Sequence, residues 1–336
     1  MDSFLVYFPL WKMSGLLILL DSFLNSNSND RKCLIMNNGW NYVDRITKQT
    51  VGKTVLQYYV ERYSHSSESE WESRIRSGAV RLGDRMCDAR EILKVNQTLV
   101  YHRPPWEEPD VPRSIEILHE DDDLLVISKP SGLPVMPGGG FLENTLLRLL
   151  AGLYPKHSPI PVHRLGRGTS GLMLLARSTA AKTELTRQMR DREIQKIYIT
   201  LASSVIKRDR FSIDTRIGKV PHPVLGELFA ASEIGLEARS EVRVLERRSD
   251  STLAEVEIFT GRPHQIRIHL ASVGHPLVGD PLYGCGGGAI VAEDWDEIAV
   301  PGDCGYFLHA QKLGFQHPRS GDRLEFVAQV PEWAKH

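Results

Sequence analysis

The segment from Pro161 to Ser178 constrains the fold most tightly, because a polar, glycine-rich loop runs directly into a continuous apolar stretch. The apolar residues from Leu172 to Ala176 show no polar alternation, which is typical of a strand covered on both faces. In the loop, Arg164 and Arg167 stand among glycines. Arginines bind anions, and glycines allow close approach to the backbone. The segment therefore predicts an anion-binding loop beside a buried sheet, with an ordinary surface turn as the alternative.

The chain of 336 residues is long enough for one large domain and one small domain. A stiff, proline-rich linker over residues 104–112 marks the expected boundary. We expect a small module over residues 45–103 and a large domain over residues 113–336. Residues 1–35 look foreign to the rest and are left out of the predicted fold, either as a disordered extension or as a segment ahead of a true start at Met36.

The small module has the pattern of a compact α/β unit. Residues 54–60 are apolar at helical spacing, and residues 71–78 form a second short helix that Gly78 ends. Ser67 or Ser69 is a candidate cap for this second helix. Strands follow at residues 79–83 and 97–101. The arginines of this unit suit either RNA binding or an ordinary solvated face.

The large domain alternates short strands with a few helices, which predicts an α+β fold. We expect a mixed, largely antiparallel sheet with flanking helices and a cleft across it. The expected hairpin joins residues 115–119 and 124–127, and further strands lie at 197–201, 241–245 and 253–259. Helices are expected at residues 144–153, at 178–192 with Ser178 as cap, and at 263–273 with Gly274 at the end.

Several motifs of this domain resemble those of the RluA-type pseudouridine synthases. His163 to Gly171 is similar to the family segment His-Arg-Leu-Asp-Arg-x-Thr-Ser-Gly, and Lys129 to Val135 is similar to Lys-Pro-x-Gly-Leu-x-Val. Lys196-Ile197-Tyr198 matches a Lys-x-Tyr element. The most specific block runs from Thr260 to His269 and continues through Gly279 to Gly284. Together the motifs occur in the family's order.

The resemblance implies that the chain isomerises specific uridines in RNA to pseudouridine, without a cofactor, and leaves open whether the substrate is rRNA, tRNA or another RNA. The target base would be flipped out of its stack, and the N1–C1′ bond would be cleaved and re-formed through C5. Arg164 would fill the space that the base leaves, Tyr198 would stack on the uracil, and Arg267 would orient the catalytic aspartate. The residues expected to contact RNA, some only as possible phosphate ligands, are Arg164, Arg167, Thr169, Lys129, Arg262 and His264.

One position departs from the family pattern, because Gly166 stands where the catalytic aspartate is expected. The carboxylates next along the chain, Glu184 and Asp191, belong to the following helix, and Asp280 is expected to organise a loop. Three interpretations follow. The chain is an active synthase with a displaced carboxylate, a catalytically impaired synthase-fold RNA binder, or a structural partner in RNA or ribosome assembly.

Charge and cysteine content narrow the class of protein. The formal net charge is −1, so RNA binding requires a local basic patch. The cysteines are scattered without a CxxC pair, which argues against a disulfide framework or a zinc site and favours an intracellular protein, with the compartment open. His264 and His269 are five positions apart with no third ligand, so no metal site is expected. We expect no membrane association and a monomeric chain.

Overall fold

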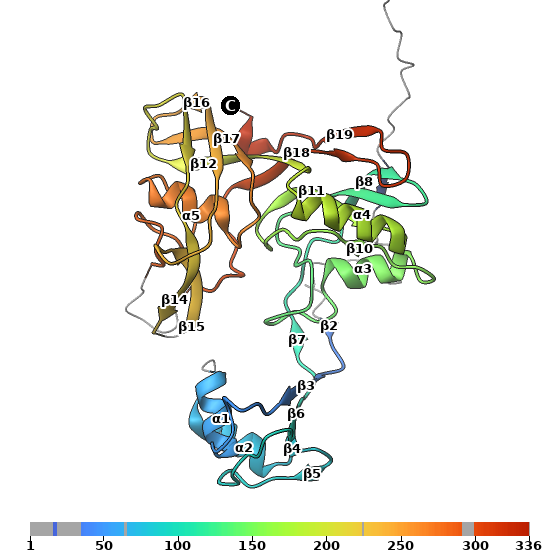
Figure 1. Ribbon diagram of the computed structural model, residues 1–336, viewed down its shortest axis with the longest axis vertical. Coiled ribbons are helices and arrows are strands. Elements are labelled where there is room, and N and C mark those ends of the chain that lie inside the picture. The colour runs from blue at the N-terminus through green and yellow to red at the C-terminus, as the bar shows by residue number, and fades with distance from the viewer. Residues whose placement is uncertain (1–15, 19–34, 64–65, 224, 291–298, 336) are drawn as a thin grey trace, which may run out of the picture.

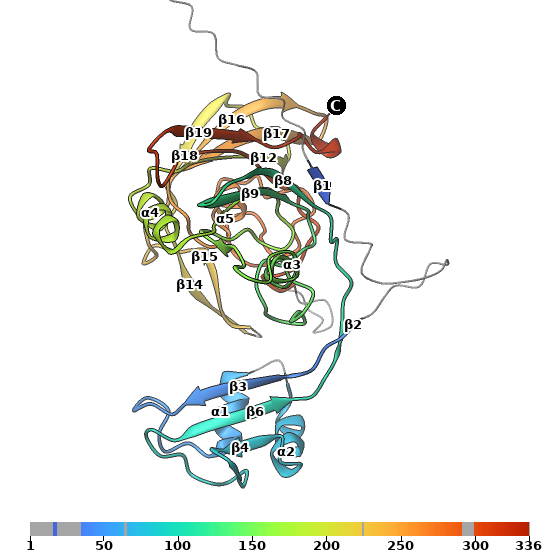
Figure 2. The same cartoon turned by 90° about the vertical axis from the view of Figure 1, so that its right-hand side faces the viewer.

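The computed structural model describes residues 16–18, 35–63, 66–223, 225–290 and 299–335. In this part of the chain, no helix has the length and apolar character needed to cross a bilayer. The described elements form a large sheet domain and a smaller unit, which lie apart in both views and are joined near β2 and β7 (Figure 1, Figure 2). The two linking strands pair with each other: β2 (Ile35–Met36) and β7 (Glu107–Glu108).

The large domain is built on a mixed sheet of eleven strands among the described residues, which confirms the predicted α+β class. All strand pairs are antiparallel except β11–β18, which is parallel. The spatial order is β1 (Leu16–Ile18), β8 (Ile115–Glu120), β9 (Leu124–Lys129), β11 (Ser170–Ala176), β18 (Leu308–Gln316), β12 (Gln195–Ser203), β17 (Ser251–Ile258), β16 (Ser240–Arg247) and β13 (Arg210–Ile213). In addition, β10 (Ile160–Pro161) pairs with β11, and β19 (Arg323–Val327) pairs with β18.

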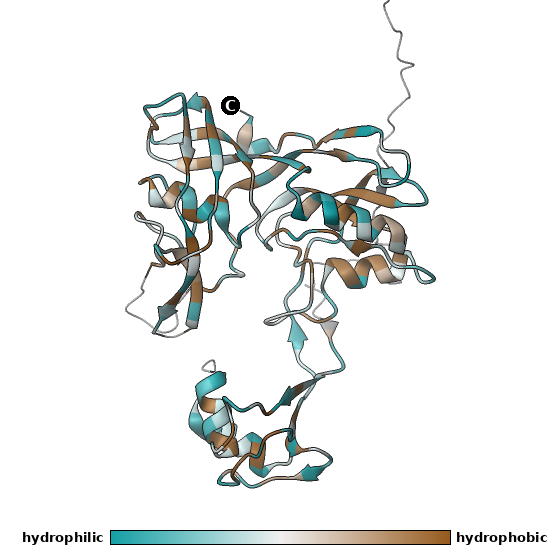
Figure 3. Ribbon diagram, viewed as in Figure 1, coloured by the Kyte–Doolittle hydropathy of each residue, from teal (hydrophilic) through white to brown (hydrophobic). Residues whose placement is uncertain are grey.

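The central strands form the core, as the apolar run predicts. In β11, Leu172 to Ala176 are all buried, and Met173 to Ala176 pair with the equally buried Leu124 to Ile127 of β9. Two helices pack beside these strands: α3 (Leu146–Leu153), which is composed mainly of hydrophobic residues, and α4 (Thr179–Arg190) (Figure 3). The predicted cap is confirmed, because Ser178 Oγ accepts a hydrogen bond from Ala181 N at 3.1 Å.

The third helix of this domain, α5 (Gln265–Ser272), begins later than the sequence predicts. His264 has a left-handed φ of 55°, so the helix cannot extend back to Pro263. The helix packs against a separate antiparallel ribbon of β14 (Ile217–His222) and β15 (Gly226–Ala231). Gly274 follows the helix with a φ of 88°, which agrees with its expected role at the end.

The small unit has its own sheet and its own aromatic core. Its strands lie in the order β3 (Trp40–Arg45), β6 (Thr98–Arg103), β4 (Val80–Leu82) and β5 (Arg85–Met86). Two helices cover this sheet: α1 (Val55–Arg62) and α2 (Glu68–Arg76). Of the two candidate caps, Ser67 caps α2 and forms a capping box with Glu70. Trp71 is fully buried and stacks on Tyr59 with ring centroids 4.6 Å apart.

Part of the N-terminal extension joins the large sheet, contrary to its exclusion from the predicted fold. Leu16 to Ile18 form β1, which pairs antiparallel with Ile115 to Ile117 of β8. A short apolar stretch can add to an exposed strand edge through backbone hydrogen bonds alone, and no local sequence signal marks such a pairing. The remaining positions of the extension, 1–15 and 19–34, lie outside the described residues.

A polar cluster ties the β8–β9 turn to the segment between β18 and β19. Asp121 Oδ2 lies 2.7 Å from His119 Nε2 and 3.1 Å from His317 Nε2. Asp123 pairs with Arg319 at 2.6 Å. Two aspartates and a histidine within reach of one another could suit a cation. However, His317 Nδ1 accepts from the backbone N–H groups of Arg319 and Ser320, so its Nε2 carries the proton donated to Asp121. The cluster is therefore a closed structural link.

Candidate active site

A cavity of about 330 Å³ opens where the loop before β11 faces β12 and α5. This volume is in the range of small-molecule sites, roughly 300–1,000 Å³. The cavity brings together seven of the positions predicted for the site. One is the loop position Gly166, and the other six contribute side chains: Arg164, Thr169, Tyr198, Arg262, His264 and Arg267.

The lining of the cavity is cationic. Four of its residues are basic, and no aspartate or glutamate is among them: the basic residues are Arg164, Lys196, Arg262 and Arg267. Arg164 is exposed and has no hydrogen bond or ion pair with the described residues. The Arg262 guanidinium makes one hydrogen bond with the described residues, from its Nε to the Glu237 carbonyl at 2.9 Å. A chain with little net charge therefore presents a local basic patch suited to phosphate.

Two of the lining residues are neutral at physiological pH. Tyr198 lies in β12, is buried, and burial raises the pKa of its hydroxyl, so the phenol keeps its proton. His264 Nδ1 lies 2.7 Å from the hydroxyl of Tyr283, which itself donates to the Phe229 carbonyl. His264 is therefore the donor at Nδ1. Burial lowers its pKa to about 4, so Nε2 is an uncharged acceptor.

Arg267 is almost fully buried and forms a two-point ion pair with Asp280, the residue that the sequence analysis assigned to loop organisation. Nε and one Nη of Arg267 lie 2.7 and 2.6 Å from the two carboxylate oxygens of Asp280. Asp280 also accepts from the backbone N–H groups of Leu282 and Tyr283, so it organises the loop as well. Burial lowers the pKa of the Arg267 guanidinium, but the hydrogen bonds and the negative charge of Asp280 outweigh this effect. The pKa of Arg267 is therefore raised.

One nitrogen of Arg267 remains free within this ion pair. The other Nη is buried and has no hydrogen-bond partner among the described residues. A buried donor without a partner is costly and usually marks a place where a ligand or water binds. Because Arg267 lines the cavity, this nitrogen marks a position for an acceptor atom of a bound molecule.

Lys129 lies outside the cavity, which contradicts the phosphate contact considered for it. It is 1% exposed, and its Nζ donates to the carbonyls of Pro130, Leu133 and Arg167 at 2.8, 2.8 and 3.2 Å. Three carbonyls satisfy all three donors of the amine, so no donor is left for RNA. Burial lowers its pKa to about 7. The hydrogen bonds of Lys129 therefore connect the end of β9 to the loop that carries the site.

Arg167 also makes contacts within the protein and does not line the cavity. Its Nε donates to the Gly302 carbonyl at 2.7 Å, one Nη lies 3.8 Å from Asp303, and the guanidinium lies 5.0 Å from the ring centre of Phe141. These contacts join the site loop to the segment before β18. That segment also carries Tyr306, a cavity residue that the sequence analysis did not select.

Tyr306 occupies the space beside Gly166. Its hydroxyl lies 2.8 Å from the position of a Cβ atom at residue 166, which is closer than real Cβ contacts allow. The same hydroxyl is 3.2 Å from Thr169 Oγ1. An aspartate at position 166 would therefore require the Tyr306 hydroxyl to shift. In the sequence, the absence of a side chain at Gly166 indicates an unusual site. However, no local pattern connects this position to Tyr306, which lies 140 residues later in the chain.

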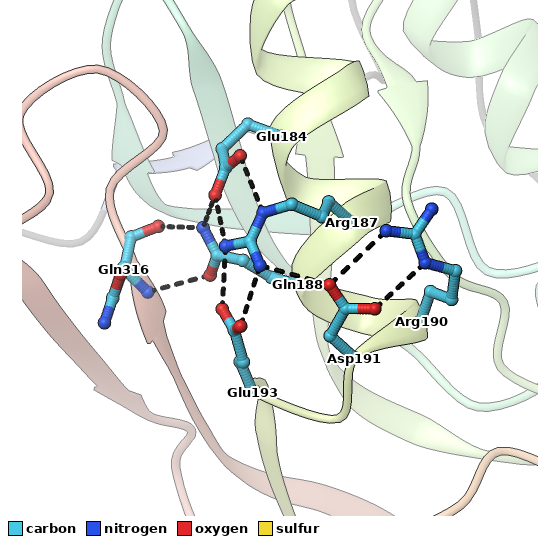
Figure 4. A network of polar contacts seen from close by, with 7 residues as sticks. All are labelled: Glu184, Arg187, Gln188, Arg190, Asp191, Glu193 and Gln316. Atoms are coloured by element: carbon cyan, nitrogen blue, oxygen red, sulfur yellow. Dashed lines mark hydrogen bonds and ion pairs between the residues drawn. The ribbon is translucent and has the colours of Figure 1, made fainter.

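The carboxylates considered as substitutes for the missing aspartate are engaged in ion pairs with Arg187 of α4. Glu184 and Asp191 both pair with Arg187, at 2.8 and 3.1 Å, and Glu193 joins them at 2.7 Å (Figure 4). Gln188 links the network to the backbone of Gln316. None of these residues lines the cavity. A displaced carboxylate from this helix is therefore not available to the site in this structure.

Comparison with known proteins gives a consistent result. A family model described as RNA pseudouridylate synthase matches residues 123–272. An uncharacterised RNA pseudouridine synthase of Synechocystis sp. is 47% identical over 277 residues, covering 82% of this chain and 94% of its own length. RNA pseudouridine synthase 5 of Arabidopsis thaliana is 40% identical over 346 residues, covering 88% of this chain and 94% of its own length.

Two further similarities concern a bacterial enzyme and a solved structure. Ribosomal large subunit pseudouridine synthase D of Neisseria meningitidis is 34% identical over 296 residues, covering 84% of this chain and 76% of its own length. The structure of human RNA Pseudouridylate Synthase Domain Containing 1 aligns with a TM-score of 0.51 at 23% identity, covering 67% of this chain and 86% of that chain. The structural likeness supports the fold of the large domain.

Proposed function

This chain belongs to the RNA pseudouridine synthase family, and from this premise we propose that its cationic cavity receives a uridine flipped out of RNA. The reaction of the family is the isomerisation of uridine in RNA to pseudouridine, so RNA is the substrate. The N1–C1′ bond breaks, the uracil turns, and C5 bonds to C1′. The observation that carries the proposal is the meeting of Arg164, Tyr198 and Arg267 around one cavity, from a loop, a strand and a helix.

The contacts of each residue support a distinct role. Arg164 is exposed and has no polar partner in the described part of the chain, so its side chain is free to enter the space that a flipped base leaves. Tyr198 is a neutral, buried phenol on the wall of the cavity, suited to stacking on uracil. Arg262 retains its terminal nitrogens for phosphate. The free Nη of Arg267 suits an acceptor atom on the target nucleotide.

We propose that large-subunit ribosomal RNA is the substrate class and that one chain is sufficient for activity. The first point follows from the name of the Neisseria relative, which acts on the ribosomal large subunit. The second is supported by the cavity, since a single chain supplies its basic, aromatic and hydrophobic lining. Transfer RNA is the alternative substrate, and a panel of unmodified transcripts distinguishes the two.

We also propose that residues 45–103 form an RNA-binding module ahead of a catalytic domain over residues 113–336. A second cavity, of about 580 Å³, lies against the aromatic side of this unit. Its lining combines two arginines with a tryptophan and four tyrosines of the small unit: Arg74, Arg103, Trp71, Tyr42, Tyr59, Tyr63 and Tyr101. Gly139 and Gly140 of the large domain also line this cavity. Aromatic faces beside cations are the usual platform for unpaired bases.

Tyr42 is the residue of this cavity that tests the module. It is half-buried and stacks on Tyr101, with ring centroids 6.0 Å apart, so one side remains open to a base. Stacking of one base on an aromatic ring contributes about 1–3 kcal/mol, so Tyr42→Ala is expected to weaken RNA binding roughly tenfold. Fluorescence anisotropy with a labelled transcript measures the change. Val43→Ala, on the opposite and exposed side of β3, serves as the control. Equal affinities of the two variants would remove support for the module.

The activity is tested with purified protein and transcribed ribosomal RNA that contains no pseudouridine. Wild type is expected to form pseudouridine, measured by mass spectrometry of the digested RNA. Tyr198→Ala is expected to slow product formation by about 10- to 100-fold, because it removes the ring proposed to stack on the uracil. Tyr198→Phe keeps that ring and is expected to stay close to wild type. Wild-type rates in Tyr198→Ala would contradict the stacking role. Tight RNA binding without product in wild type would instead favour a catalytically impaired RNA-binding protein.

A further inference from the structure

Two glycines of the site loop are explained by the side chain that lies against them. Gly166 and Gly168 have no left-handed φ, so backbone freedom does not require glycine at either position. The Cβ of a residue at 166 would lie 2.8 Å from the hydroxyl of Tyr306, and a Cβ at 168 would lie 3.0 Å from its ring. A side chain at either position would therefore require the phenol of Tyr306 to shift.

The Tyr306 hydroxyl has the surroundings of a functional group. The side chain is 5% exposed yet lines the cavity, and among the described residues its hydroxyl has one hydrogen-bond partner, Thr169 Oγ1 at 3.2 Å. The guanidinium of Arg267 lies 4.1 Å from the centre of its ring. The free Nη of Arg267 belongs to this same group of atoms. Apart from Tyr198 and Thr169, no other hydroxyl lines the cavity, and no carboxylate does among the described residues.

We propose that Tyr306 is a further catalytic residue, whose hydroxyl contacts the ribose of the target uridine in the place that a side chain at position 166 would occupy. This inference rests on the proposed function of the cavity. It explains how a site without a carboxylate on its wall supports the family reaction. It also assigns a role to Gly166: the absence of a side chain at this position leaves space for the phenol of Tyr306.

The step that this geometry suits is a displacement at C1′ of the ribose. The bond from C1′ to the phenol oxygen forms as the N1–C1′ bond breaks, and the phenol proton passes to the departing uracil. After the uracil turns, C5 attacks C1′, the bond to the phenol oxygen breaks, and the C5 proton returns to that oxygen. Atoms and charge balance without a further reactant. Tyrosine serves as the nucleophile in some glycosidases, where the same kind of bond is cleaved.

The charge around Tyr306 is consistent with both halves of this cycle. Burial raises the pKa of the Tyr306 hydroxyl, and the guanidinium of Arg267 opposes this effect. The resting phenol therefore keeps the proton that the first half transfers to uracil. In the second half, the phenol oxygen leaves C1′ with negative charge, and a guanidinium beside it stabilises that charge.

The test is Tyr306→Phe, which keeps the ring against Arg267 and removes only the oxygen. With unmodified ribosomal RNA, kcat for pseudouridine formation is expected to fall by about 10²-fold or more while KM and the melting temperature stay near those of wild type. Tyr154→Phe is the matched control, because it removes a hydroxyl that bonds to Glu120 outside the cavity. Its kcat is expected to match wild type.

A second variant keeps the test decisive if the lost oxygen disturbs packing. Gly166→Ala places a Cβ against the Tyr306 hydroxyl and is expected to lower kcat, but to add little in the Tyr306→Phe background, where that oxygen is gone. An active wild type with a fully active Tyr306→Phe overturns the role of Tyr306 and leaves the proposed function standing. A wild type that forms no pseudouridine overturns the proposed function and this role together.

Discussion

Asp280→Ala is expected to reduce the free energy of unfolding by about 3–5 kcal/mol, because it leaves a buried cation without its counterion. The side chains of Arg267 and Asp280 are 2% and 0% exposed, and both carboxylate oxygens accept from the guanidinium. The substitution also strips two loop N–H groups of their acceptor, those of Leu282 and Tyr283. Urea unfolding, followed by fluorescence and circular dichroism, measures the loss.

An exposed pair with the same two-point geometry provides the control for this prediction. Arg243 bonds both oxygens of Glu255 at 3.0 and 2.9 Å, but the two side chains are 46% and 28% exposed. Solvent screens such a pair, so Glu255→Ala is expected to cost at most about 1 kcal/mol. The double variant Arg267→Met with Asp280→Leu is expected to be more stable than Asp280→Ala, since no charge stays unpaired. Equal losses from Asp280→Ala and Glu255→Ala would contradict the argument.

Local patterns in the sequence predict the elements of this fold well, because the interactions behind them are local. The apolar run from Leu172 to Ala176 is a buried strand, Ser178 and Ser67 cap their helices, and the pattern around the 121–123 turn forms the expected hairpin. Each signal depends on side chains within a few positions of one another. The predicted start of α5 is too early because His264 has a left-handed φ, and its side chain bonds to the distant Tyr283, which no local pattern indicates.

The contacts that define the site are long-range, and a single sequence gives no indication of them. Arg267 was expected to pair with the aspartate that Gly166 replaces, and Asp280 was assigned to the loop, yet these two residues bind each other. The place of Lys129 in a motif suggests a phosphate ligand, but its Nζ donates hydrogen bonds to backbone carbonyls instead. Tyr306 has no motif of its own. Its relation to Gly166 appears only when β18 is placed beside β11.

Gly171→Ala is expected to cost roughly 3–5 kcal/mol of stability, because two unfavourable effects coincide at this position. Gly171 has a φ of 100°, which residues with a Cβ adopt only under strain. An added Cβ would also lie 2.3 Å from the carbonyl oxygen of Ala310 and 2.7 Å from its nitrogen. These are backbone atoms of β18, which pairs with β11 at this residue, so no side chain can rotate away to relieve the contact.

Gly274→Ala separates the two effects, because Gly274 has a similar φ of 88° and no atom within 4 Å of the added Cβ. Its cost is expected to be the backbone strain alone, about 1–2 kcal/mol. The excess loss in Gly171→Ala then measures the contact between β11 and β18. Because Thr169 and Gly168 directly precede this contact, forcing the strands apart also shifts the loop beside Tyr306, and pseudouridine formation is expected to fall with stability. If both variants unfold at the same urea concentration, β18 moves to accommodate the added methyl group. The close pairing of β11 and β18 would then not be the reason for glycine at position 171.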